Sequence, residues 1–202
     1  MDVLTPPNGT GPGVLVAHPW WGLNQTIRDY GAALAREGFV VGLADVFNGE
    51  TTTSIDTAET LIRKYWSAAE GILTEGLRNL AGHDAVVGDR VGAIGFSFGG
   101  FHLLELLARP DLPLARLATY YATHPLSEHH APVLAHLAAS DDYESAEDMA
   151  AIAAALAKDT ESAAYSYPGT KHWFAEVDRP EYDGPAADLA FKRTVAFLKA
   201  HR

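Results

Sequence analysis

No cysteine occurs in this sequence, which excludes disulfide bonds and metal sites built on thiolates. No apolar run approaches the length needed to cross a membrane. Residues 1–7 also lack the basic stretch and the apolar core of a secretion signal. From these three absences we expect a cytoplasmic protein.

Positive charge is scarce as well. The chain has 15 Lys and Arg against 26 Asp and Glu, which gives a formal net charge of -11. A surface this acidic repels phosphate backbones and anionic lipid headgroups. We therefore expect neither nucleic acid nor membrane as a partner, but a small-molecule substrate bound by a monomer or a homodimer.

The pattern of apolar residues predicts one α/β domain spanning residues 1–202, because this length fits a single domain and no linker divides the chain. Apolar runs typical of buried strands alternate with segments of helical spacing. The first dozen residues are expected to be irregular, and the second helix is expected to break near Gly71 or Gly76. Predicted strands cover 13–17, 39–44, 90–95, 117–121, 133–139 and 163–167, and predicted helices cover 25–37, 57–80, 99–109, 146–158 and 185–201.

This alternation favours a doubly wound, mostly parallel sheet of about six strands, in the spatial order 2-1-3-4-5-6. Ligands of such sheets bind at the carboxyl ends of the strands, where the direction of winding reverses. We therefore expect the chemistry just after Ala17 and just after Gly95.

The segment Gly95-Phe96-Ser97-Phe98-Gly99 follows a predicted strand and begins a predicted helix. This is the G-x-S-x-G nucleophile elbow in the structural context that it requires. The tight turn exposes the serine hydroxyl, and the helix N-terminus favours negative charge beside it. The motif indicates that Ser97 is a nucleophile.

A serine nucleophile needs a histidine base, and the base needs an orienting carboxylate. In this fold the chain order is Ser, then Asp or Glu, then His. His172 lies in the loop after the sixth predicted strand and is the expected base. Asp141, after the fifth, is the expected acid, with Asp142 as the alternative because the register is open by one residue.

Backbone amides should form an oxyanion hole. One donor is expected to be Phe98, and the second should be Trp20 or Trp21 in the loop after the first strand. The aromatic side chains near these positions predict a small apolar pocket for short acyl groups. The residues predicted to line this substrate pocket are Trp21, Phe96, Trp173 and Phe174.

Several histidines between residues 124 and 136 could suggest a metal site. Their spacing matches no known zinc pattern, and no carboxylate stands in register with them. We expect no metal and no organic cofactor. The histidines in question are His124, His129, His130 and His136.

Taken together, these motifs resemble the dienelactone hydrolase family of the α/β-hydrolase superfamily. The resemblance implies a triad of Ser97, Asp141 and His172, with Trp20 and Phe98 at the oxyanion positions. It rests on Gly22-Leu23-Asn24, the elbow at 95–100, Pro132-Val133-Leu134 before Asp141, and Tyr167-Pro168-Gly169 before His172 and Phe174.

Three positions depart from the family pattern. The best-known members use a cysteine nucleophile where this chain has Ser97. Pro19 stands where those members place a glutamate, and Glu176 stands where they bind the substrate carboxylate with an arginine. We therefore expect a neutral short ester rather than a carboxylated lactone.

The resulting hypothesis is a serine hydrolase that cleaves small carboxylic esters or lactones through an acyl-enzyme. A thioesterase or a small-peptide hydrolase would use the same triad, since the pocket and not the triad reads the leaving group. A catalytically silent ligand-binding homologue and a metal-dependent hydrolase built on the histidine cluster are the other interpretations.

Overall fold

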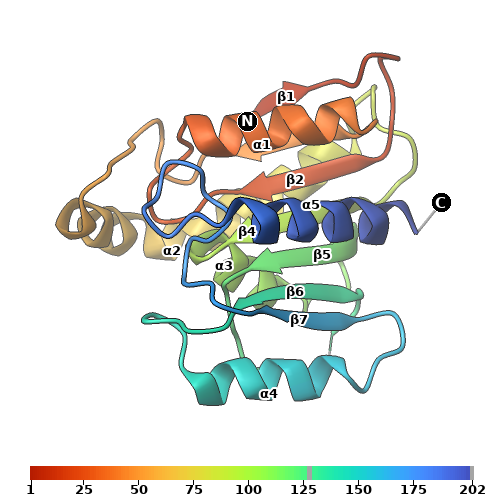
Figure 1. The fold of residues 1–202 in the computed structure, drawn as a ribbon. Helices are drawn as coiled ribbons and strands as arrows, with labels where there is room; N and C mark the ends of the chain where they lie inside the picture. Colours follow the sequence, from red (N-terminus) through yellow and green to blue (C-terminus); the bar gives the residue numbers. More distant parts are fainter. Residues whose placement is uncertain (127–128, 201–202) are drawn as a thin grey trace.

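The computed structural model describes residues 1–126 and 129–200. Within these residues, seven strands form one sheet in the order β1-β3-β2-β4-β5-β6-β7 (Figure 1). The strands from β2 to β7 are parallel, and β1 pairs antiparallel with β3 at the edge. Their bounds are β1 Asp2–Leu4, β2 Gly13–Ala17, β3 Val40–Ala44, β4 Val91–Phe96, β5 Leu114–Tyr120, β6 Val133–Ala138 and β7 Ala163–Tyr167.

The predicted fold class and the order of the six parallel strands are confirmed. The prediction that the first dozen residues are irregular is wrong for Asp2–Leu4, which form β1. A strand of three residues is too short to show a period of two. It forms because β3 has a free edge, where Val3 pairs with Gly42.

Helices cover both faces of the sheet. Figure 1 shows α1 and α5 in front of it, α2 and α3 behind it, and α4 alongside β7. The helices are α1 Gln25–Arg36, α2 Ile55–Ala81, α3 Phe98–Leu106, α4 Ala146–Leu156 and α5 Gly184–Lys199. None of the helices within the described ranges is long and apolar enough to span a membrane.

The helices differ from the expectations in the middle of α2. The helix α2 continues through both Gly71 and Gly76, so the predicted break is absent. A Cβ on Gly76 would lie 3.2 Å from the Leu15 side chain, which indicates that this glycine lets α2 approach the sheet closely. The predicted final helix extended to His201, which lies outside the described residues.

The sheet interior places the site. Every residue of β2, β3, β4, β5 and β6 is buried, as the continuous apolar runs predict. The carboxyl ends of β2 and β4 are neighbours, since Ala17 pairs with Gly95. The loops that follow β2, β4, β6 and β7 therefore meet at one end of the sheet.

Candidate active site

Ser97 lies in a tight turn between β4 and α3. Its backbone has φ +46° and ψ -113°, a strained conformation for a residue with a side chain. A Cβ on Gly95 would lie 2.4 Å from Gly100 Cα, and one on Gly99 would lie 2.7 Å from Ala17 Cβ. The elbow therefore requires glycine on both sides of the serine.

Three residues that are distant in the sequence form one hydrogen-bonded chain beside this turn. Ser97 Oγ lies 2.9 Å from His172 Nε2. His172 Nδ1 lies 2.8 Å from both carboxylate oxygens of Asp141. The Asp141 side chain is fully buried and His172 is 3% exposed. Asp142, the alternative acid, is exposed to solvent.

The carboxylate of Asp141 is stabilised as an anion. Burial alone would raise its pKa, but the hydrogen bond from His172 and the amides of Tyr143 and Glu144 outweigh this effect and lower it. These amides donate to Oδ1 at 2.9 and 3.0 Å. Asp141 is therefore ionised at neutral pH and fixed in place, as a residue that orients an imidazole must be.

His18, which sequence reasoning missed, holds the loop after β2 against the segment after β3. Its Nδ1–H donates to Pro19 O at 2.6 Å, and its Nε2 accepts the Val46 N–H at 3.0 Å. Burial lowers the pKa of His18 to about 4, so the ring is neutral and can hold both bonds. The ring contacts Phe47 and lies near Phe98.

The predicted oxyanion donors, the backbone amides of Trp20 and Phe98, belong to the two segments that come together near the His18 ring. Phe98 is the first residue of α3, and Trp20 follows the Pro19 carbonyl that His18 holds. In residues 1–126 and 129–200, neither the Trp20 nor the Phe98 amide donates to a protein acceptor. Both amides are thus available for an oxyanion, and the α3 N-terminus adds a favourable dipole.

Comparison with known proteins agrees with this arrangement of loops on the sheet. The sequence profile of the dienelactone hydrolase family matches residues 2–202. The chain belongs to this family. It is therefore a member of a family of hydrolases, and the resemblance expected from the motifs is confirmed.

Known proteins are similar to this chain over nearly its whole length. A protein of Bradyrhizobium sp, named a probable 2-oxo-3-(5-oxofuran-2-ylidene)propanoate lactonase, is 28% identical and is matched over 96% of this chain and 85% of its own. A dienelactone hydrolase-like promiscuous phosphotriesterase from metagenomic libraries superposes with a TM-score of 0.82 at 23% identity, covering 95% of this chain and 87% of that one. Esterase 2 of Thermogutta terrifontis, solved after phosphonylation by sarin, gives a TM-score of 0.74 at 14% identity, covering 98% of this chain and 88% of that one.

Glu176, which replaces the expected arginine of the family, does not face a substrate. Its side chain is 0% exposed, and its Oε1 accepts the Tyr121 hydroxyl at 2.8 Å. Burial raises its pKa to about 8, so the carboxyl is protonated at neutral pH. The expectation that its charge repels a carboxylate therefore needs correction: the position offers no cation, but it presents no surface charge.

Two tyrosines that sequence reasoning missed flank the His172 ring. The ring centroids of Tyr121 and Tyr143 lie 4.8 and 5.0 Å from that of His172. Tyr121 follows β5 directly, and Tyr143 is two residues after Asp141. Their nearness to strand ends was the available signal, but which way each ring points depends on packing.

The predicted pocket aromatics separate into two groups. Trp21 and Trp173 pack with Trp20 beside the triad, with ring centroids 5.1 to 5.5 Å apart. Phe96 and Phe174 are 1% and 0% exposed and Trp21 is 2% exposed, so all three rings are packed in the core, and their contact with a substrate stays a prediction. Phe96 stacks on Tyr120 on the side of the sheet that faces α1 and α5.

The histidines of the suspected cluster are dispersed. Both ring nitrogens of His136 are hydrogen-bonded, Nδ1 to the Tyr167 hydroxyl and Nε2 to the Thr194 hydroxyl. His124 and His129 lie near different carboxylates, Glu105 and Asp159. His130 donates its backbone amide to Leu107 O. Among the residues that the structure describes, no three potential ligands converge on a point.

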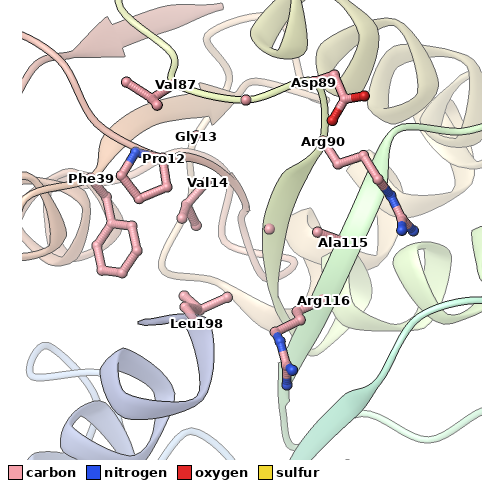
Figure 2. Close-up of a pocket in the computed structure, with 12 residues that line it drawn as sticks. Pro12, Gly13, Val14, Phe39, Val87, Asp89, Arg90, Ala115, Arg116 and Leu198 are labelled. Carbon is pink, nitrogen blue, oxygen red and sulfur yellow. The ribbon is translucent and has the colours of Figure 1, made fainter. Parts of the chain in front are cut away.

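A cavity of about 160 Å³ lies at the opposite end of the sheet (Figure 2). Its walls include Val14 near the start of β2, Arg90 just before β4, and Arg116 near the start of β5. Ser97 follows the last residue of β4. The cavity lies at the amino ends of these strands and Ser97 at the carboxyl end of β4, so the two are separate sites.

Proposed function

We propose that this protein is a serine hydrolase that cleaves small carboxylic esters or lactones through an acyl-enzyme. The observation that carries the proposal is the hydrogen-bonded chain from Ser97 Oγ through His172 to Asp141. A nucleophile, a base and an orienting carboxylate within hydrogen-bond distance are the arrangement that activates a serine hydroxyl.

The chemistry follows from this geometry. His172 Nε2 takes the proton as Ser97 Oγ attacks the ester carbonyl, and the Trp20 and Phe98 amides stabilise the oxyanion. The imidazolium then gives its proton to the departing alcohol, which leaves the acyl group on Ser97. A water molecule, deprotonated by His172, attacks the acyl-enzyme and releases the carboxylic acid. No metal or organic cofactor takes part in these steps.

The relatives support this proposal from two sides. The Bradyrhizobium protein carries a lactonase name, and the Thermogutta esterase is covalently modified by an organophosphorus compound. The substrate is proposed to lack a carboxylate, because Glu176 occupies the position of the expected arginine and is buried. We propose that the protein acts on its small-molecule substrate in the cytoplasm, as a monomer or a homodimer, without a nucleic acid or membrane partner.

The direct test is labelling with a fluorophosphonate, which forms a stable bond with activated serines. Wild-type protein is expected to gain one adduct, located by mass spectrometry on the peptide that contains Ser97. Ser97→Ala is expected to gain none. Equal labelling of the variant, or an unlabelled wild type, would contradict the proposal.

His18 provides a second test, because it holds the oxyanion loop without touching the substrate. His18→Phe keeps a ring against Phe47 but loses both hydrogen bonds, so the Trp20 amide is expected to lose its alignment. We expect kcat on 4-nitrophenyl acetate to fall about 10- to 100-fold, with a smaller change in KM.

The matched control is His83→Phe. His83 also accepts a backbone amide, that of Ala85, but it lies in the loop before β4, at the end of the sheet away from Ser97. Circular dichroism checks that both variants fold. An unchanged kcat in folded His18→Phe would show that the loop does not depend on this histidine.

A further inference from the structure

A larger cavity, of about 520 Å³, lies between α3, the segment after β5, and α4 with the residues just before it. Its volume falls within the range of pockets that bind small organic molecules. Much of its wall is apolar, and the residues responsible are Phe101, Pro125, Leu126, Ala151, Ile152 and Ala155.

Residues of this cavity wall contact each member of the triad. The Phe101 amide donates to Ser97 O at 2.9 Å. The Tyr143 ring lies 5.0 Å from the His172 ring, and the Glu144 amide donates to Asp141 Oδ1 at 3.0 Å. Phe101 lies one turn of α3 after Ser97, and the Tyr143 ring covers His172, so the cavity lies next to the triad.

The charged groups of the cavity are acidic. Glu144 and Asp148 line it, and the Glu105 carboxylate lies 3.8 Å from His124 Nε2 at its edge. None of its lining residues in the described part of the chain is Lys or Arg. Such a cavity disfavours an anionic group and stabilises a cation.

The state of Glu144 depends on pH. Burial raises its pKa to about 7, and its carboxylate accepts the Thr123 hydroxyl. The pKa is raised, so the charge is present above pH 7 and absent below it. Phe101 and Tyr143 add aromatic rings to the wall, and the face of such a ring attracts a cation within about 6 Å of its centroid.

We propose that this cavity binds one arm of the ester substrate, an apolar chain that ends in a cation such as a quaternary ammonium group. This inference rests on the proposed function, because it assigns the substrate class of the same site. Either the acyl or the alcohol side of the ester can supply the arm, and both present the same chemistry to the cavity.

The experiment compares matched esters at pH 8, where Glu144 is ionised. For the acyl side these are 4-nitrophenyl esters of hexanoate, 6-(trimethylammonio)hexanoate and adipate. For the alcohol side they are acetates of hexanol, 6-(trimethylammonio)hexanol and 6-hydroxyhexanoate. In one series we expect kcat/KM to be about 10-fold higher for the cationic arm than for the uncharged arm, and lowest for the carboxylate.

Two variants and one control test whether the preference for a cationic arm arises in this cavity. Ala151→Phe fills the cavity and is expected to lower the ratio of six-carbon ester to acetate turnover about 10-fold. Glu144→Gln is expected to lower the ratio of cationic to uncharged arm at least threefold at pH 8. Ala154→Phe adds the same ring to α4 at a residue that does not line the cavity, and it should change neither ratio.

Binding of hexyltrimethylammonium, measured by calorimetry, tests the cavity without hydrolysis. If hexyltrimethylammonium binds to wild type and not to Ala151→Phe, the cavity assignment is supported even when no ester is cleaved. Absence of ester cleavage would contradict only the proposed function. If 4-nitrophenyl acetate is cleaved but neither series prefers the cation, or if hexyltrimethylammonium does not bind, the cavity assignment is wrong.

Discussion

Asp141→Asn is expected to lower kcat for ester hydrolysis about 10⁴-fold, with little change in KM. The asparagine can still accept the Tyr143 and Glu144 amides through its carbonyl oxygen, so the loop keeps its shape. Its NH₂ group then faces His172 Nδ1 and donates to it. This fixes the tautomer with hydrogen on Nε2, which cannot accept the proton of Ser97.

The neighbouring carboxylate gives a matched control. Asp142→Asn removes the same charge one residue away, at an exposed position, and is expected to change kcat less than threefold. Steady-state kinetics on 4-nitrophenyl acetate measure both variants. If Asp142→Asn lost most of its kcat while Asp141→Asn kept nearly all of it, Asp142 and not Asp141 would be the acid.

The free energy of unfolding of Glu176→Gln, relative to that of wild type, is expected to increase as the pH rises. In wild type, burial raises the pKa of Glu176 from its ordinary 4.5 to about 8. Between these values the folded state holds a proton that the unfolded state has released. The free energy of unfolding of wild type therefore falls with pH through this window and levels off above about pH 8.

The size of this effect follows from the shift. Between pH 5 and pH 9, the difference in unfolding free energy between Glu176→Gln and wild type should grow by about 4 kcal/mol, at 1.36 kcal/mol per pKa unit. Gln keeps the oxygen that accepts the Tyr121 hydroxyl but has no charge to desolvate.

Urea unfolding at a series of pH values between 5 and 9 measures this difference. Glu147→Gln, which changes an exposed carboxylate of α4, serves as the control and should show a nearly constant difference from wild type. A constant difference for Glu176→Gln as well would mean that Glu176 is ionised in the folded protein at neutral pH.

Much of the site can be predicted from short patterns. Ser97 is identifiable because its elbow is a contiguous motif between a strand and a helix. His172 and the loop of Asp141 and Asp142 follow from the chain order that the fold imposes on loops after successive strands. The order of the six parallel strands follows from right-handed crossovers between buried apolar runs.

What the sequence by itself determined is therefore the family, the parallel sheet, Ser97, His172 and the loop that carries the carboxylate. Only the tertiary structure decided the selection of Asp141 over Asp142, the placement of Phe96 and Phe174 in the core, the protonated state of Glu176 and the acidic cavity beside Tyr143. The physical reason is that burial and side-chain direction arise from contacts between distant segments. A local pattern fixes which loop a residue occupies, whereas its solvent exposure and its partners depend on how β5, β6, α3 and α4 pack together.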